Sequence, residues 1–232
     1  YDAIAKKERP CKNACGVGAI VSDKYGRAYI DTEKWVSCGM CMVSCPFGAI
    51  SDKSQIFQLT RALQEEGSEI IAEIAPAFVG QFGENINPRN IKAALIELGF
   101  KGVHEVALGA DIGAVAEAHH YVEKVVTGEL PFLLTSCCPS WAMLAKKFFP
   151  DLIDQISQEL TPMVATARSI KKEHPNAKVV FIGPCAAKKL EASRRSVRSD
   201  VDFVVTFEEL QAMFDAKEID LSQYEAESSF HD

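Results

Sequence analysis

Residues 41–50 read CMVSCPFGAI and residues 11–20 read CKNACGVGAI, so a ten-residue pattern returns after thirty residues. Each copy has two cysteines in a Cys-x-x-x-Cys spacing, and each ends in Gly-Ala-Ile. A repeat of this kind indicates an internal duplication. Closely spaced thiols in both copies are typical of a metal site, because thiolates are preferred ligands of zinc and of iron–sulfur clusters.

The second copy is extended on its amino-terminal side by one more cysteine, which gives Cys38-x-x-Cys41-x-x-x-Cys45-Pro46. This run is similar to the cysteine run of bacterial ferredoxins, whose thiolates wrap a [4Fe-4S] cluster. In a duplicated ferredoxin each cluster takes its fourth ligand from the other run. By that logic Cys15 would join Cys38 and Cys41.

The match to a ferredoxin is incomplete, because the register expects a further cysteine where Trp35 stands. The first copy also lacks its two corresponding cysteines, so the five thiols suffice for one four-ligand cluster and not for two. We therefore predict one [4Fe-4S] cluster. A zinc site built from the same thiols and inert buried cysteines are the alternatives. The expected ligands are Cys38 and Cys41, then Cys15, with Cys11 and Cys45 competing for the last position.

The composition excludes several classes of protein. The formal net charge is −7 and the basic residues form no stripe, so we expect no nucleic-acid partner. No uncharged apolar run reaches the roughly 18 residues of a membrane span, and residues 1–10 lack a signal core, so we expect a cytoplasmic protein. A disulfide scaffold is the alternative use of eight cysteines. The acidic segment 218–232 is expected to be solvated and poorly ordered.

From about residue 55 the pattern changes to alternating strands and helices, which predicts an α/β fold with a mainly parallel sheet covered by helices. The small cysteine-rich domain would precede it, with domains at 1–54 and 55–232. Strands are predicted at 69–75, 103–108, 131–134, 178–182 and 202–205. Helices are predicted at 55–66, 87–98, 111–126, 140–149, 161–174 and 206–217, with caps at Asn87, Asp111 and Thr206.

The last three cysteines each follow a predicted strand, where open α/β sheets bind their ligands. Cys137 and Cys138 come after the strand at 131–134, and Cys185 after the strand at 178–182. Because neighbouring side chains point apart, one of the adjacent pair would bind metal and the other would carry protons as a thiol. Lys188 and Glu191 share a helical face with Cys185, and an ordinary exposed ion pair is the alternative explanation for them.

Two motifs carry a family resemblance. Residues 135–141, TSCCPSW, resemble the first signature of the [FeFe]-hydrogenase catalytic domain, and residues 183–191, GPCAAKKLE, resemble its second. The resemblance implies reversible reduction of protons to H₂ at an H-cluster, a [4Fe-4S] cubane joined to a diiron subsite with CO and cyanide. Ferredoxin or a similar carrier would be the electron partner.

Carried over residue by residue, the resemblance implies that Cys138 and Cys185 are two of the four thiolates of the cubane. Cys137 would pass protons to the diiron subsite, while Lys188, held by Glu191, would donate a hydrogen bond to a cyanide.

The resemblance also implies a pocket wall and a proton path. Pro76 would line the diiron pocket, and Glu117 and Ser157 would relay protons to Cys137. His120 stands where the family has a second glutamate, and imidazole can also relay protons.

Two departures from the family pattern stand out. Gly183 replaces the methionine usual before Pro-Cys and would open space beside the diiron subsite. No cysteine follows Cys185, so the third signature is absent, and the chain is expected to be a C-terminally truncated or split part of such an enzyme. A missing C-terminal segment or a second chain would supply the remaining thiolates. The alternatives are a non-catalytic H₂ or redox sensor, a cluster-assembly protein, and a plain electron-transfer module.

Overall fold

The computed structural model describes residues 9–230, which fall into two compact units. The first unit contains the described residues up to Lys53 together with Cys138–Asp154, and the second contains Ser54–Cys137 and Gln155 onward. The elements of the first unit are α1 (Pro10–Asn13), β1 (Ile20–Ser22), β2 (Ala28–Ile30), α2 (Met40–Val43) and α6 (Pro139–Phe148). The 3₁₀ segment η3 (Pro150–Gln155) ends at the unit boundary.

The sequence repeat is also a structural repeat. Helices α1 and α2 begin thirty residues apart and pack against each other, and each is followed by a cysteine and a left-handed glycine. In the first copy the Ala19 N–H donates to Cys15 Sγ over 3.1 Å. In the second copy the Ala49 N–H donates to Cys45 Sγ over 3.4 Å. Corresponding cysteines of the two copies therefore have the same backbone environment.

The second unit is built on a four-stranded sheet in the order β4-β3-β5-β6, in which every pairing is parallel. This confirms the predicted fold class. Its strands are β3 (Ile70–Ile74), β4 (Gly102–Glu105), β5 (Lys178–Gly183) and β6 (Phe203–Thr206). Every residue of β3 is buried, as is expected when helices cover both faces of a parallel sheet.

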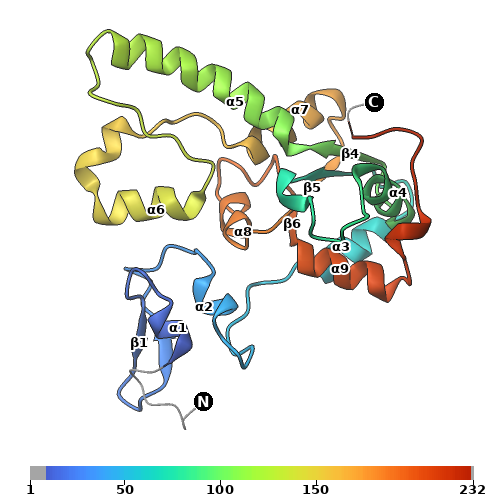
Figure 1. Cartoon of the computed structure of the whole chain (residues 1–232), viewed down its shortest axis with the longest axis horizontal. Helices are drawn as coiled ribbons and strands as arrows, with labels where there is room; N and C mark the ends of the chain where they lie inside the picture. The colour runs from blue at the N-terminus through green and yellow to red at the C-terminus, as the bar shows by residue number, and fades with distance from the viewer. Residues whose placement is uncertain (1–8, 231–232) are drawn as a thin grey trace. The chain divides into compact units, whose positions relative to one another are not determined.

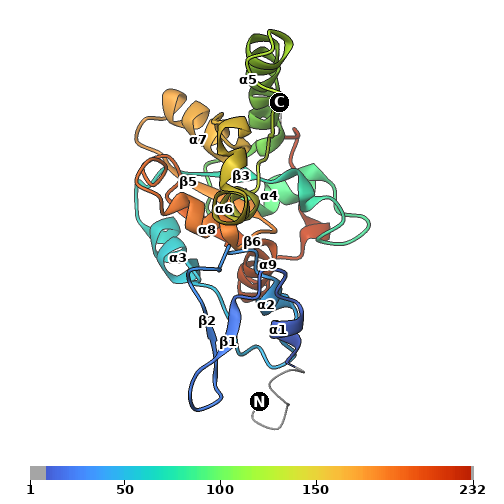
Figure 2. The ribbon, with the colours of Figure 1, turned by 90° about the vertical axis from the view of Figure 1, so that its left-hand side faces the viewer.

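Helices lie on both sides of this sheet. Helix α7 packs on β3 and β5, and α9 packs on β5 and β6; in Figures 1 and 2 they lie above and below the sheet. The helices are α3 (Ile56–Gln64), α4 (Pro88–Leu98), α5 (Val106–Tyr121), α7 (Pro162–Glu173), α8 (Ala187–Ala192) and α9 (Phe207–Ala216). Shorter segments are η1 (Pro76–Phe78), the π-helical η2 (Val122–Val126) and η4 (Leu221–Gln223).

Helix capping follows two of the three sequence predictions. The Asn87 side chain accepts the N–H groups of Arg89 and Asn90, and the Asn90 side-chain oxygen in turn accepts the Asn87 N–H. Thr206 and Glu209 form the predicted capping box of α9. Asp111, however, caps nothing, because the helix already begins at Val106, directly after β4. The apolar residues 106–108 belong to the helix and not to the strand.

The strand predicted at 131–134 does not join the sheet. Only a single parallel bridge forms, between Leu134 and Ile156. Pro131 cannot donate to a ladder and Phe132 stays 41% exposed, so this short apolar run lacks the neighbours that a strand needs. Cys137 and Cys138 therefore do not follow a sheet strand, which corrects that part of the prediction.

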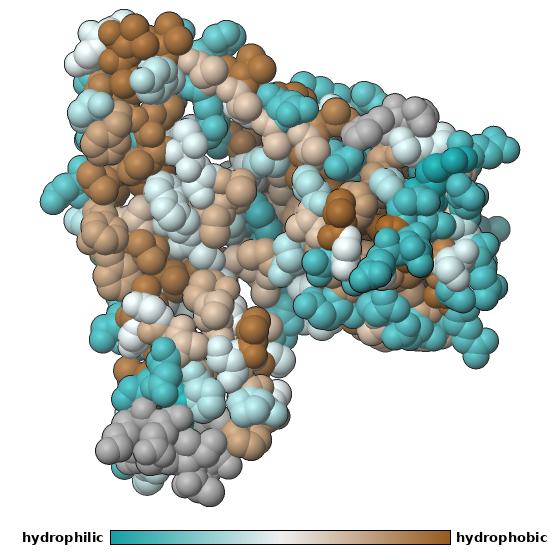
Figure 3. Space-filling model, viewed as in Figure 1, coloured by the Kyte–Doolittle hydropathy of each residue, from teal (hydrophilic) through white to brown (hydrophobic). Residues whose placement is uncertain are grey.

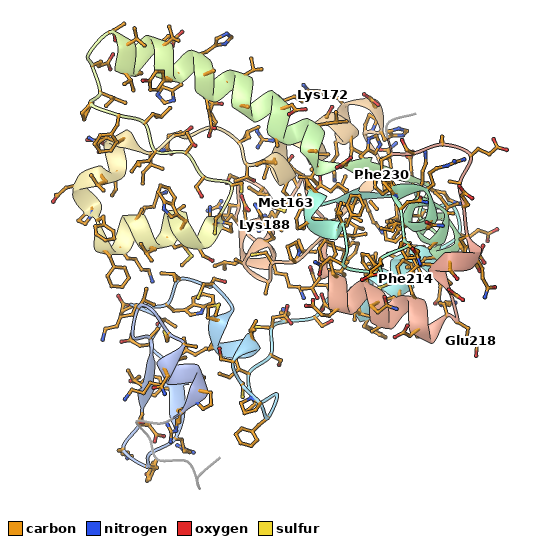
Figure 4. The ribbon with its side chains drawn as sticks, in the orientation of Figure 1. Met163, Lys172, Lys188, Phe214, Glu218 and Phe230 are labelled. Atoms are coloured by element: carbon orange, nitrogen blue, oxygen red, sulfur yellow. The ribbon has the colours of Figure 1, made fainter. Side chains whose placement is uncertain are left out.

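The C-terminal segment is ordered against α4, contrary to the prediction. Asn90 donates to the Tyr224 carbonyl over 2.7 Å and Lys92 to the Ser229 carbonyl over 2.6 Å. Phe230 is 7% exposed and meets Phe78 edge-on, with ring centroids 5.4 Å apart (Figure 4). Buried aromatic and aliphatic side chains outweigh the acidic character on which the prediction was based.

Helix α5 is rich in apolar residues, and they are not confined to one face of the helix. One side packs on α7, and Gly109 permits this contact because a Cβ there would collide with Thr166 and Pro162. Leu108, Ile112 and Val115 remain about half exposed, at 47%, 58% and 59%. Figure 3 shows brown, hydrophobic surface in the region of α5. No helix within residues 9–230 is long and apolar enough to cross a membrane.

Replacing Asn87 with alanine removes the cap of α4, and we expect it to lower the free energy of unfolding by about 1 kcal/mol. Urea denaturation followed by circular dichroism measures the change. Asn85→Ala is the matched control, because Asn85 is exposed in the same loop. Equal effects of both substitutions would contradict the assigned cap.

Candidate functional site

Cys185 lies where the sequence placed it, directly beyond the carboxyl end of β5. Pro184 separates it from the strand, and the Cys185 carbonyl accepts the Lys188 N–H over 3.1 Å at the start of α8. The thiol is partly exposed. It is therefore available to a ligand at the edge of the sheet.

Lys188 and Glu191 form a buried ion pair, which rules out the alternative of an ordinary exposed pair. Lys188 Nζ donates to Glu191 Oε2 over 2.7 Å, and the two residues are 8% and 3% exposed (Figure 4). Thr161, just before α7, donates its hydroxyl to Glu191 Oε1 over 2.8 Å. Both carboxylate oxygens are thus satisfied, as a buried charge requires.

Lys188 also connects the two cysteine signatures. Its Nζ donates to the Cys137 carbonyl over 2.9 Å, across 51 positions of sequence. Two of the three ammonium donors are engaged by these described partners, and the third can serve an anionic ligand. The Cys137 thiol itself is exposed beside this anchored carbonyl.

Cys138 is the N-cap residue of α6 and belongs to the first unit, whereas Cys137 and Cys185 belong to the second. Its thiol is exposed, and Pro139 opens the helix behind it. The amino-terminal end of a helix favours negative charge, which suits an anionic cluster. Neither Cys138 nor Cys185 is used as apolar core packing.

Glu73 is a candidate residue that the sequence analysis missed. It lies in the middle of β3, is 0% exposed, and neither carboxylate oxygen has a hydrogen-bond partner among the described residues. Burial raises the pKa of Glu73 well above its ordinary value; the Lys188 charge opposes this rise and the Glu191 charge adds to it. The only available signal was an acidic residue inside the apolar run 70–74.

The expected proton-path residues are placed but not connected. Glu117 and His120 lie on α5 and are partly exposed. Ser157 is also partly exposed, and its hydroxyl accepts the Glu159 N–H over 3.2 Å. Within residues 9–230 no hydrogen bond joins these three side chains to one another or to Cys137. Pro76 begins η1 and is exposed, so its role also stays a prediction.

Gly183 does not open space, contrary to the sequence prediction. A Cβ on Gly183 would lie 2.6 Å from Phe181 Cε1 and 3.1 Å from Ala75 Cβ. The Phe181 ring, 3% exposed, already fills the volume that a side chain at Gly183 would need. The glycine therefore compensates for a bulky neighbour on the same strand.

The thiols of the first unit form two environments. Burial raises the pKa of the Cys41 thiol, and the charges of Cys38 and Cys15 raise it further. Backbone N–H groups, led by that of Ala49, lower the pKa of Cys45. Such N–H to sulfur contacts also occur around iron–sulfur clusters, where they stabilise thiolate charge.

The described residues show no group of three or more His, Cys, Asp or Glu side chains arranged around a single metal ion. A ready-made zinc site is therefore not seen. An iron–sulfur cluster places an inorganic core between its thiolates, so its ligands stand further apart than those of one ion.

Two protein families match separate ranges of this chain. Residues 68–231 match the family described as iron only hydrogenase large subunit, C-terminal domain, and residues 28–51 match a 4Fe-4S binding domain.

Individual relatives are of two kinds. Iron hydrogenase 1 of Clostridium pasteurianum is 31% identical over 193 residues, covering 74% of this chain and 33% of that protein. The cytosolic Fe-S cluster assembly factor NAR1 of Kluyveromyces lactis is 36% identical over 105 residues, covering 45% of this chain and 22% of its own length. A solved [FeFe]-hydrogenase HydA1 of Chlamydomonas reinhardtii has a TM-score of 0.68 at 25% identity. That match covers 75% of this chain and 50% of the algal one.

Glu73→Gln should stabilise the protein increasingly as the pH rises. Below about pH 4 Glu73 is protonated in both the folded and unfolded states. Above that pH the unfolded carboxyl ionises while the buried one stays protonated, so the native protein loses up to about 1.4 kcal/mol of stability per pH unit. Glutamine removes this loss.

Urea denaturation of the metal-free protein at pH 5.5, 7 and 8.5 measures this dependence. Glu66→Gln, at an exposed position, is the control and should follow the wild-type profile. Parallel profiles for wild type and Glu73→Gln would show that Glu73 ionises normally in the folded protein. His104 lies opposite Glu73 in the register of β3 and β4, and burial lowers its pKa. The wild type, Glu73→Gln and Glu66→Gln all contain His104, so its contribution is present in all three profiles.

Proposed function

The chain belongs to the iron-only hydrogenase family, and we propose that it takes part in the reaction 2H⁺ + 2e⁻ ⇌ H₂ at an H-cluster. The observation that carries this proposal is the hydrogen bond from Lys188 Nζ to the Cys137 carbonyl. It links the two signatures at a buried ion pair whose carboxylate oxygens are both hydrogen-bonded, an arrangement that no simple electron-transfer module needs.

Three side chains of this sequence have the chemistry that such a cluster needs. Cys138 and Cys185 offer soft thiolate sulfurs, and Lys188 offers a third ammonium donor of the kind that would hydrogen-bond an anionic cyanide. A complete cubane would need two more thiolates than these. The 232 residues span a third of the clostridial relative and half of the solved algal chain.

When bound, the H-cluster supplies the metal-centred redox chemistry. The residues of this chain hold it and handle protons. Cys137 would hold and release a proton at Sγ, with its backbone fixed by Lys188. Glu117, Ser157 and His120 would deliver protons to that thiol, and Pro76 would shield the diiron subsite.

Electrons would enter through the first domain, proposed as residues 1–54, and serve the catalytic domain, proposed as residues 55–232. A [4Fe-4S] cluster there fits the matched 4Fe-4S binding domain at 28–51. Its partner would be a ferredoxin or a similar carrier. We place the protein in the cytoplasm, where thiols stay reduced.

A second candidate function is a non-catalytic one, in sensing or cluster assembly. The likeness to the NAR1 assembly factor favours it. The two functions differ in their need for Cys137. A sensor or carrier has no use for a proton-passing thiol, whereas hydrogen activation depends on one.

The test is H₂ evolution from the full-length protein after iron–sulfur reconstitution and addition of the synthetic diiron cofactor. We expect gas production by the wild type and a loss of at least about 100-fold in Cys137→Ala, because proton transfer by a positioned group contributes that much. Iron content and the infrared bands of bound CO and cyanide should be unchanged in the variant. A wild type that shows those bands but evolves no gas would favour sensing or assembly.

A further inference from the structure

We propose that the cluster of the first unit is held by three cysteines only, Cys15, Cys38 and Cys41, and that its fourth iron is exchangeable. The inference rests on the [4Fe-4S] site of the proposed function and not on hydrogen activation. It assigns an open, labile iron position to a cluster that would otherwise be an ordinary electron relay.

The structural repeat decides how the thiols group. Cys11 and Cys41 are the second residues of α1 and α2, and Cys15 and Cys45 stand at the same place after each helix. Both members of the second pair accept an N–H from the residue four positions on. In a twofold repeat, a site that combines Cys41 with Cys15 is matched by a second place that combines Cys11 with Cys45.

The exposure of the thiols agrees with this grouping. Cys38 is exposed, and Cys15 and Cys41 are partly exposed. Cys11 is 0% exposed and Cys45 is 8% exposed. The buried pair lies with the apolar interior of this small unit, whose other buried apolar members include Ala19, Ile20 and Val36. Burial therefore separates Cys11 and Cys45 from the other three thiols, and we assign neither of them as the fourth ligand of the exposed site.

In the ferredoxin register the fourth ligand position of this cluster is residue 35, three residues before Cys38, and this residue is Trp35. An indole has only an N–H donor and cannot ligate iron. The backbone N–H of Trp35 donates to the Asp31 carbonyl over 2.9 Å, and the Trp35 carbonyl accepts a hydrogen bond from Lys147 Nζ over 2.8 Å. This backbone is held at both ends. The Asp31 carboxylate is also engaged, by the Glu33 N–H at 3.1 Å and by Lys34 Nζ at 3.8 Å.

Three thiolates are enough for two forms of the cluster. A [4Fe-4S]²⁺ core that releases Fe²⁺ becomes [3Fe-4S]⁰, and an added oxidant such as ferricyanide takes one electron to give [3Fe-4S]⁺. Adding Fe²⁺ to the reduced three-iron core restores [4Fe-4S]²⁺. The open iron would therefore respond to oxidant and to iron supply, while the three sulfurs stay bound.

The test is electron paramagnetic resonance of the reconstituted full chain carrying Cys138→Ser and Cys185→Ser, which keeps the downstream site free of iron. Ferricyanide should convert the cluster to the [3Fe-4S]⁺ signal at about one spin per protein, and Fe²⁺ with dithionite should restore a [4Fe-4S]⁺ signal. Trp35→Cys should close the corner and abolish the three-iron signal. Trp35→Phe is the matched control and should behave as the parent.

Ligand variants separate the possible outcomes without relying on Trp35→Cys folding. Cys15→Ser should lose the cluster, whereas Cys11→Ser and Cys45→Ser should keep the conversion. A parent that retains four irons under ferricyanide, or a cluster lost in Cys45→Ser or Cys11→Ser, would overturn the three-thiolate assignment. Failure of any cluster to form in the parent would overturn the [4Fe-4S] site itself. Neither result depends on hydrogen evolution.

Discussion

The arrangement of the second unit depends on one buried interaction, the ion pair of Lys188 and Glu191. Removing two charges from water costs several kcal/mol each, and the cost is offset only when the remaining donors and acceptors find partners. Here Thr161 serves Glu191 and the Cys137 carbonyl serves Lys188. The pair therefore connects the start of α7, helix α8 and the segment that contains Cys137, which lie far apart in the sequence. A ligand that used the last ammonium proton would complete the set.

Glu73 shows what the same pocket does with a third charge. Lys188 and Glu191 neutralise each other, so an ionised Glu73 would leave one uncompensated charge in the interior. Burial therefore favours the neutral form of this carboxyl. A buried acid without partners is costly for stability, and residues of that kind cluster at functional sites. Stability alone gives no reason for glutamate at this position in β3.

The sequence analysis succeeded where chemistry is local. Asn87 and Thr206 correctly predict the starts of α4 and α9, and the β-branched run before Cys185 predicts β5. The position of Cys185 at the end of a strand therefore follows from short-range sequence patterns. The sequence analysis failed where packing between distant segments decides. The run 131–134 has strand-like residues but no strand to pair with. The influence of the Lys188 and Glu191 charges on Glu73 and the close approach of the Phe181 ring to Gly183 depend on how β3, β5 and α8 are arranged in space.

The repeat in the first unit combines one backbone conformation with two different sets of cysteines. The backbone of both copies is preserved to the level of the N–H to sulfur contacts, although one copy keeps Cys38 and the other has no equivalent cysteine. Backbone geometry is held by turns and glycines with positive φ, which do not depend on the metal. Ligand number can therefore fall without loss of the fold. The cost appears at the metal, where a missing thiolate leaves an iron open to exchange. In an electron relay such a position exposes the cluster to its surroundings, and the relay then depends on iron supply and oxidant as well as on potential.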